Sequence, residues 1–365
     1  MSDPRAQLTR ARCVVIKIGS STLAGDNRIF RRLAESIAAR KEASFVVVSS
    51  GAIALGMRKL GYGARPREMA KLQAAAAAGQ SLLMRAYEEA FDACGLAVAQ
   101  VLLTHADLAD RVRANNARAA LGALLDAGAV PILNENDSVA TDEIRDKFGD
   151  NDQLAAMVAP LVDADLVILL SDVEGLLDRR GQRVPTVRDV ASEALPHIRL
   201  SAGGVGSGGM ASKVESARRA TLAGANVVVA DAGVSGVLEA VLGGQDIGTL
   251  FVASRKRLSA KKCWIAFTLR PRGDLVLDRG AAEAVRARGR SVLSVGLLGV
   301  RGDFRAGDAV RIVDADGREI ARGVSRCGAA EAAMVAGKAR EDLPIELAEL
   351  RVVVHADELV VGGHL

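Results

Sequence analysis

Short runs of Val, Ile and Leu without polar alternation recur along the chain up to about residue 250. Such runs are typical of parallel strands that are covered on both faces. The predicted strands are Cys13–Ile18, Phe45–Ser49, Ala97–Leu103, Val130–Leu133, Leu166–Leu170 and Asn226–Ala230. Segments with helical periodicity separate them, namely Ile29–Arg40, Glu68–Cys94, Asn115–Ala127, Gln153–Leu161 and Met210–Ala223. This alternation predicts an α/β fold, a three-layer αβα sandwich with a mainly parallel sheet that binds ligands at the carboxyl ends of its strands.

The pattern changes after Ile247, where a charged stretch leads to Trp264 and then to short apolar segments. Turn signals such as Asp278–Gly280 and Asp314–Gly317 separate these segments. Closely spaced strands and turns predict a small β-barrel or sandwich. We therefore expect a catalytic domain over residues 1–250, a linker over 251–262, a β-rich domain over 263–354 and a tail over 355–365.

Composition narrows the class of protein. Half of the 365 residues are hydrophobic and only 3% are aromatic, which suits two domains rich in helices and buried strands. Lys17 interrupts the apolar run nearest the N-terminus, and no apolar run is long enough to span a bilayer. The four cysteines and four histidines are scattered, which favours reduced thiols and argues against a zinc site. We expect a cytoplasmic protein.

Two predicted strands end in small polar turns, Lys17–Ser21 and Ser49–Ala52. A glycine lets the backbone approach a phosphate, backbone amides donate to it, and a lysine adds a mobile cation. Each turn alone is also compatible with an ordinary strand-to-helix connection.

Amides and carboxylates gather in two further segments, Asn134–Asp137 and Lys147–Asp152. They would suit a small polar substrate that carries an ammonium group. Asn, Asp and Gly are also common turn formers, so the residues alone leave both interpretations open. Asp172, just after another strand, could hold magnesium or a nucleotide, or only cap a turn.

A glycine-rich segment, Gly203–Lys213, precedes a predicted helix. Gly204, Gly206 and Gly209 fit a GxGxxG pattern, but no apolar strand enters the segment, so a dinucleotide site is not expected. The sequence also lacks the GxxxxGK[ST] motif of P-loop enzymes. The segment could close over a triphosphate, with Lys213 in the first turn of the helix; a surface linker would also explain the glycines but not the helix that Lys213 begins.

Seven motifs occur in one order along the chain: VVIKIGSS, VVVSSGAIALG, LQAAAAAGQ, PILNENDSVAT, FGDNDQLAA, LLSDVEGLL and SGGMASKVESA. With them the chain resembles the amino-acid kinase family, most closely its members that phosphorylate glutamate. The residues from Lys262 to Val354 resemble a PUA domain more loosely, through GVSRC and the preceding Asp-Gly turns. The resemblance implies ATP-dependent phosphorylation of the glutamate side-chain carboxylate, which gives glutamyl 5-phosphate and ADP in the first step of proline biosynthesis. ATP and Mg²⁺ are the implied cofactors.

The resemblance also implies a role for each matching residue. Lys17, Lys213 and Asp152 would be catalytic, with Asp152 orienting the two lysines. The glutamate site would consist of Ser50, Asn134, Asp137 and Asn151. The ATP site would consist of Lys17, Ser171, Asp172, Ser207, Gly208, Gly209, Met210, Ala211, Ser212 and Lys213. Ser171 stands where the family usually has Thr, and the segment SGGMASK lacks a Thr that often follows; both departures keep a hydroxyl or a small residue. Mg²⁺ would accompany the ATP phosphates, and no protein ligand is assigned to it.

The resemblance further implies a dimer or tetramer, feedback inhibition by proline at the glutamate site, and a glutamyl-phosphate reductase as a candidate partner. We expect no membrane or nucleic-acid partner. Two alternatives stay open: a related kinase acting on aspartate, acetylglutamate, carbamate or UMP, and an RNA-binding or RNA-modifying protein, for which the basic C-terminal third would speak. The scarcity of aromatic residues for base stacking argues against the second.

Overall fold

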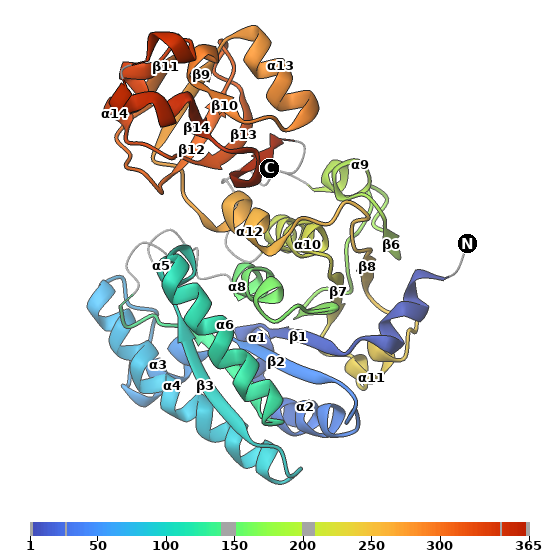
Figure 1. The fold of residues 1–365 in the computed structure, drawn as a ribbon. Helices are drawn as coiled ribbons and strands as arrows, with labels where there is room; N and C mark the ends of the chain where they lie inside the picture. Colours follow the sequence, from blue (N-terminus) through green and yellow to red (C-terminus); the bar gives the residue numbers. More distant parts are fainter. Residues whose placement is uncertain (1–2, 26–27, 140–150, 199–208, 344, 363–365) are drawn as a thin grey trace. The chain divides into compact units, whose positions relative to one another are not determined.

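The computed structural model describes residues 3–25, 28–139, 151–198, 209–343 and 345–362 (Figure 1). The chain divides into two compact units, Met1–Arg257 and Leu258–Leu365, each with its own hydrophobic core. Among the helices of the described residues, none is both long and apolar enough to cross a membrane.

The first unit is built on a sheet to which the described residues contribute eight strands, in the order β3-β4-β2-β1-β5-β7-β8-β6. Neighbouring strands from β3 to β7 are parallel, whereas β8 runs antiparallel to β7 and parallel to β6. The strands are β1 (Cys13–Ile18), β2 (Ser44–Ser49), β3 (Val98–Leu103), β4 (Val130–Glu135), β5 (Leu166–Ser171), β6 (Thr186–Val187), β7 (Asn226–Asp231) and β8 (Thr249–Phe251). The predicted α/β fold with a mainly parallel sheet is confirmed.

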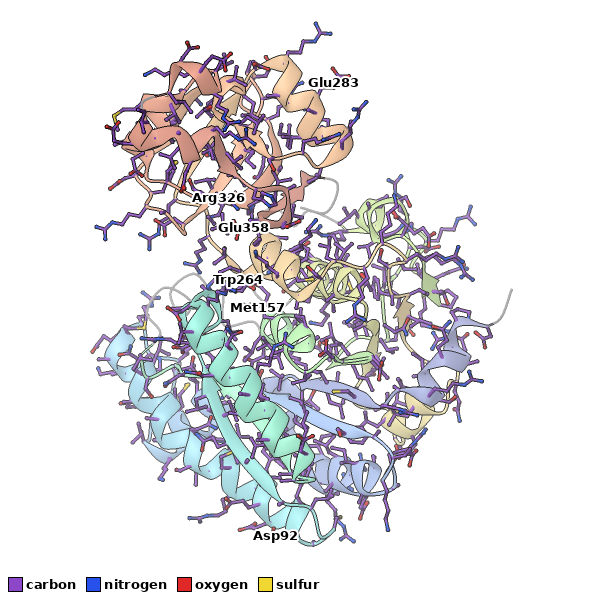
Figure 2. All side chains as sticks on the ribbon, in the orientation of Figure 1. Asp92, Met157, Trp264, Glu283, Arg326 and Glu358 are labelled. Atoms are coloured by element: carbon purple, nitrogen blue, oxygen red, sulfur yellow. The ribbon has the colours of Figure 1, made fainter. Side chains whose placement is uncertain are left out.

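Helices cover both faces of this sheet and complete the three layers (Figure 1). The first core includes residues of η1 (Pro4–Arg10), α2 (Arg28–Ala38), α3 (Ala52–Lys59), α4 (Met69–Asp92) and α11 (Val237–Leu242). The second includes residues of α5 (His105–Ala109), α6 (Arg111–Asp126), α8 (Asn151–Val158), η2 (Ala159–Leu161), α9 (Val190–Glu193) and α10 (Met210–Ala223). Leu23 of α1 (Ser20–Gly25) also belongs to the first core, and η3 (Leu195–His197) is the other helical element of this unit. Met157 on α8 belongs to the second core (Figure 2).

The alternation of side chains along β1 decides which residues can meet. Val14, Ile16 and Ile18 belong to the first core. Val15 belongs to the second, which α8 and α10 also line. Because successive side chains of a strand point to opposite faces, Lys17 lies on the face of Val15. A lysine in an apolar strand is therefore directed toward α8 and α10.

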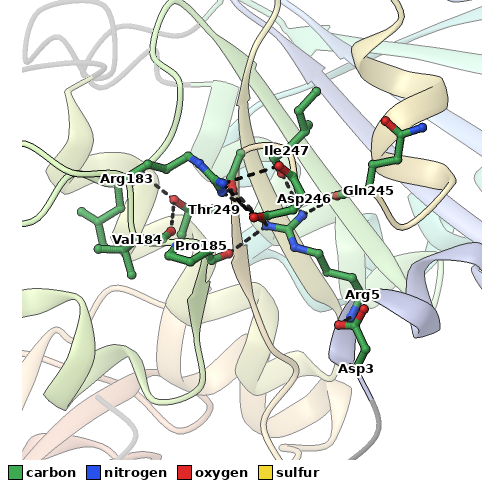
Figure 3. A network of polar contacts seen from close by, with 11 residues as sticks. Asp3, Arg5, Arg183, Val184, Pro185, Gln245, Asp246, Ile247 and Thr249 are labelled. Carbon is green, nitrogen blue, oxygen red and sulfur yellow. Dashed lines mark hydrogen bonds and ion pairs between the residues drawn. The ribbon is translucent and has the colours of Figure 1, made fainter.

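The buried Arg5 links η1 to the edge of the sheet formed by β8 and β6 (Figure 3). Its guanidinium pairs with Asp246 at 3.1 Å and donates hydrogen bonds to the backbone carbonyls of Pro185, Gln245, Ile247 and Gly248. Arg183 also pairs with Asp246, at 3.0 Å. The network ties η1 to the segments that lead into β6 and β8.

The second unit contains a five-stranded sheet in the order β11-β9-β12-β13-β15 and a two-stranded sheet of β10 and β14, counted over its described residues. The strands are β9 (Gly273–Leu277), β10 (Val292–Leu293), β11 (Leu297–Gly302), β12 (Ala309–Val313), β13 (Glu319–Val324), β14 (Val352–Val354) and β15 (Leu359–Val361). The helical elements are α12 (Ala260–Cys263), η4 (Trp264–Thr268), α13 (Arg279–Arg288), η5 (Ser294–Gly296), α14 (Ala329–Val335), η6 (Arg340–Asp342), η7 (Ile345–Arg351) and η8 (Ala356–Glu358). Trp264 is labelled in Figure 2. The predicted small β-rich domain is present, with two helices, α13 and α14, that the turn pattern did not indicate.

Candidate functional site

Lys17 is a buried cation in the middle of the sheet. Its strand, β1, lies between β2 and β5, and only 5% of the residue is exposed. A buried charge is stable only when it is paired, so this ammonium group needs a counter-charge from the helices above it.

Asp152, in the first turn of α8, supplies that counter-charge to two lysines. Its Oδ1 lies 2.7 Å from the Nζ of Lys17, and its Oδ2 lies 3.1 Å from the Nζ of Lys213 in α10. The side chain of Asp152 is 0% exposed and those of Lys17 and Lys213 are 7% and 4% exposed. The structure therefore brings together three residues that are far apart in the sequence and that we expected to act together.

The charge state of this cluster depends on the pKa of Asp152. Burial by itself would raise the pKa of Asp152, but the ammonium groups of Lys17 and Lys213 outweigh it, and the pKa lies below the ordinary value for aspartate. Asp152 is therefore ionised at neutral pH. Within this group of three residues, two ammonium groups share one carboxylate.

The N-terminus of α10 adds to this positive potential. The helix begins at Met210, with Gly209 as its N-cap, and no acidic residue lies in its first turn. Backbone N–H groups at a helix start attract anions, and the helix dipole strengthens the attraction. Met210 and Ala211 are half-buried, and Ser212 is buried beside Lys213. The predicted ATP residues Ser207 and Gly208 lie outside the described residues.

An amide cluster lies at the ends of β2 and β4. Asn151 Nδ2 donates to the carbonyl oxygen of Ser49 at 2.8 Å, to Ser50 Oγ at 2.8 Å and to Asn134 Oδ1 at 3.1 Å. Asn134 and Asn151 are 4% and 6% exposed. The structure thus brings together three of the four predicted substrate residues. Because Asn151 and Asp152 are consecutive, this cluster adjoins the lysines.

The fourth predicted substrate residue, Asp137, lies in the turn that follows β4 and is half-buried. Its position is three residues beyond Asn134, at the same end of the sheet. A carboxylate there could pair with an ammonium group of a substrate.

Ser171 and Asp172 come at the carboxyl end of β5, next to β1. Ser171 Oγ donates to Asp172 Oδ1 at 3.0 Å. Ser171 is buried and Asp172 is exposed. Both lie at the strand edge that carries Lys17, which is the place we expected for nucleotide contacts.

Helix α4 contributes two polar residues that the sequence analysis did not assign. Gln80 Oε1 accepts a hydrogen bond from Asn134 Nδ2 at 2.9 Å, and Tyr87 donates to Ser49 Oγ at 2.9 Å. Gln80 is the last residue of the motif LQAAAAAGQ. Helical periodicity does not indicate which group a polar residue on a buried helix face contacts.

A metal ion has little support from the protein alone. Across the described ranges, no group of three or more His, Cys, Asp or Glu side chains could hold one. A Mg²⁺ ion that is held mainly by phosphate oxygens and water needs no such group.

The arrangement suits the transfer of a phosphoryl group to a small polar acceptor. The two lysines and the α10 N-terminus offer positive charge where negative charge would develop on phosphoryl oxygens. The neighbouring amides and hydroxyl offer directed hydrogen bonds to an acceptor carrying carboxylates. Burial of both clusters strengthens these interactions relative to water.

Family models and curated proteins match this chain over most of its length. The model of the amino acid kinase family matches residues 12–231, and the model of the PUA domain matches residues 273–344. A glutamate 5-kinase from Myxococcus xanthus is 46% identical over 375 residues, which cover 99% of this chain and 99% of that protein. A glutamate 5-kinase from Ralstonia nicotianae is 44% identical over 372 residues, covering 98% and 99%. A solved structure of isopentenyl phosphate kinase gives a TM-score of 0.46 at 17% identity, over 66% of this chain and 100% of that chain.

Proposed function

The chain belongs to the amino acid kinase family, and on that basis we propose that it transfers the γ-phosphoryl group of ATP to the side-chain carboxylate of glutamate. The products are glutamyl 5-phosphate and ADP, in the first step of proline biosynthesis. The observation that carries phosphoryl transfer is the buried cluster in which Asp152 pairs with both Lys17 and Lys213. Relatives named glutamate 5-kinase over nearly their full length support glutamate as the acceptor.

The acceptor needs no catalytic base. A glutamate side chain has an unperturbed pKa of about 4.3, so it is already an ionised nucleophile at neutral pH. One carboxylate oxygen forms a bond to the γ-phosphorus while the bond from that phosphorus to the β,γ-bridging oxygen breaks, and ADP leaves with the electron pair. Catalysis then consists of in-line positioning and of charge stabilisation.

Different residues of the chain would provide the positioning and the charge stabilisation. Lys17 and Lys213 place their ammonium groups against the transferring phosphoryl group, where negative charge spreads in the transition state. Asp152 holds both lysines in place without competing for the phosphate, because its carboxylate lies between them in the interior. ATP binds along Ser171, Asp172 and the segment Ser207–Lys213.

The amide cluster binds the amino acid. Ser50 Oγ and the second N–H of Asn134 donate to its carboxylate oxygens, Asn151 holds both groups in position, and Asp137 pairs with its ammonium group. Because Asn151 and Asp152 are consecutive, an acceptor bound by this cluster would lie beside the lysines. Mg²⁺ accompanies the ATP phosphates and, when bound, neutralises part of their charge; no residue of the described chain is assigned to it.

The proposal also covers the regulation, oligomeric state, partner and location of the protein. Proline would compete at the glutamate site as a feedback inhibitor, and the chain would form dimers or tetramers. The acyl phosphate product reacts with water, so a glutamyl-phosphate reductase is the expected consumer and a candidate partner. The four cysteines are reduced and form no disulfide in the described chain, which suits the reducing cytoplasm.

A hydroxylamine assay tests the proposal directly. Hydroxylamine converts an acyl phosphate into a stable hydroxamate, so ATP consumption with glutamate should yield glutamyl hydroxamate in equal amount. Aspartate, acetylglutamate and UMP are the controls that separate this activity from those of related kinases. Rapid turnover of one of these three, with none for glutamate, would refute the choice of substrate.

A further inference from the structure

Gln80 is joined to the amide cluster from the helical layer behind the sheet. Its Oε1 accepts from Asn134 Nδ2 at 2.9 Å, across 54 positions of sequence. Only 9% of Gln80 and 4% of Asn134 are exposed, so water does not compete for this hydrogen bond.

The contact fixes the direction of the Asn134 amide. With Nδ2 committed to Gln80, Asn134 Oδ1 accepts from Asn151 Nδ2 at 3.1 Å and from the backbone N–H of Glu135 at 2.9 Å. An amide turned by half a rotation would set Nδ2 of Asn134 against two donors. It would also set its oxygen against the oxygen of Gln80. Gln80 therefore acts together with the Glu135 N–H and Asn151 to select one of the two rotamers of the Asn134 amide.

Close packing between α3 and α4 holds Gln80 in place. A Cβ on Gly79 would lie 1.7 Å from the carbonyl oxygen of Ala52, and one on Gly56 would lie 1.7 Å from that of Ala75. Side chains at either position would force the two helices apart. Ala52 is the first residue of α3, which starts two residues after Ser50. The helix that carries Gln80 is thus packed directly on the segment that carries Ser50.

A second contact from the same helix face supports this role. Tyr87, two helical turns beyond Gln80, donates to Ser49 Oγ at 2.9 Å in the buried interior. Helix α4 therefore contacts the ends of both strands that carry the amide cluster, β4 through Gln80 and β2 through Tyr87.

We propose that Gln80 is a positioning residue of the amino-acid site: its Oε1 holds Asn134 in the rotamer that presents Oδ1 to Asn151. The proposal rests on the proposed function, because it names a further residue of the glutamate site. Gln80 acts through its oxygen, since its Nε2 is buried without a hydrogen-bond partner within the described chain. Asn134, Asn151 and Ser50 are thereby oriented before the substrate arrives, which lowers the cost of binding.

A double-mutant cycle tests this role. Gln80→Met removes the acceptor and keeps a flexible side chain of similar length, and Asn134→Ala removes its partner. Ser81→Ala, at the next and exposed position of α4, is the matched control. The hydroxylamine assay on the full-length chain gives kcat and the KM for glutamate and for ATP.

We expect Gln80→Met to raise the KM for glutamate about tenfold, equivalent to about 1.4 kcal/mol, the scale of one lost buried hydrogen bond. The kcat and the KM for ATP should stay within about twofold, and Ser81→Ala should match the wild type. In the Asn134→Ala background, Gln80→Met should add less than about twofold, because its partner is already gone.

Two outcomes would overturn the proposal: an unchanged glutamate KM in Gln80→Met, or an equal increase with and without Asn134. If Gln80→Met does not fold, as judged by circular dichroism, Gln80→Leu takes its place with the same expectation. A crystal structure of the ligand-free variant separates this test from the proposed function. There, Asn134 should leave Asn151, and an Asn134 still bonded to Asn151 would refute the positioning role even if the wild type proved inactive on glutamate.

Discussion

Replacing Asp152 by Asn removes a carboxylate that two buried ammonium groups share, while keeping the size of the side chain. In the native protein the two Nζ atoms lie 2.7 and 3.1 Å from its oxygens. The variant removes the carboxylate that lies between the Lys17 and Lys213 ammonium groups in the interior. We expect both ammonium groups to move away from the positions in which, as proposed, they meet the phosphoryl group.

The size of the effect can be worked from these distances. At an effective dielectric constant of about 20, each contact corresponds to about 5–6 kcal/mol of Coulomb attraction, which desolvation offsets in large part. Removing one partner of a buried ion pair costs about 3–5 kcal/mol of unfolding free energy. For a unit of this size, that lowers Tm by about 6–20 °C. We expect kcat to fall about 100-fold, because both lysines lose their positions.

The stability difference should depend on pH. The pKa of Asp152 is lower in the folded chain than its unfolded value, which is about 4. Its contribution to stability is therefore fully present above that unfolded value and is lost as the pH falls through the folded pKa. Urea unfolding of wild type and Asp152→Asn should differ most at neutral pH and converge in acid.

Asp163→Asn is the matched control. Asp163 also faces two cations, Arg118 at 3.7 Å and Arg257 at 3.6 Å, but its side chain is 69% exposed. Its φ of 48° lies in the left-handed region, which Asn adopts more readily than most residues. We expect its unfolding free energy to change by less than about 1 kcal/mol and its kcat to stay normal.

The charge-balance account would be refuted if Asp152→Asn kept the wild-type kcat and Tm. A second variant sharpens the test. Lys17→Met combined with Asp152→Asn removes one of the two ammonium groups that lose the shared carboxylate, so this double variant should be more stable than Asp152→Asn alone, although no more active. Additive destabilisation would show that repulsion between the lysines is not the cause.

Three further outcomes are expected. Lys213→Ala should lower kcat by about 100-fold or more with a smaller change in the glutamate KM, measured in the hydroxylamine assay, and near-normal turnover would exclude Lys213 from phosphate contact. Asn151→Ala should raise the KM for glutamate far more than that for ATP, and the reverse would mean that the two sites have been exchanged. Arg5→Ala should lower the unfolding free energy by about 2–4 kcal/mol in urea titrations, because buried carbonyls lose their donor, while kcat of the folded fraction stays normal.

The long parallel strands were predictable because their residues carry a strong local signal. β1 has the predicted bounds, Cys13–Ile18. β5 ends at Ser171, one residue beyond the predicted strand Leu166–Leu170. β6 and β8 gave no such signal, since strands of two and three residues are too short to show a period. β8, Thr249–Phe251, also crosses the expected boundary at residue 250, and its place in the sheet depends on pairing with β7.

The gathering of polar residues at one edge of the sheet was predictable for a similar reason. Parallel strands bring their carboxyl ends to one edge, so polar residues after β1, β2, β4 and β5 had to meet there. The LQAAAAAGQ motif, by contrast, did not reveal what Gln80 does. Its contact with Asn134 depends on how closely α4 approaches α3, and that distance is set by Gly56 and Gly79 on different helices.

The position of Lys17 connects the pattern of the chain to its chemistry. β1 is buried on both faces, so a charge within it is tolerated only where a helix brings a counter-charge to the same face. Asp152 does so for Lys17 and also for Lys213. The alternation that buries Val15 is thus also what directs Lys17 toward Asp152, beside which we propose that the phosphoryl group is transferred.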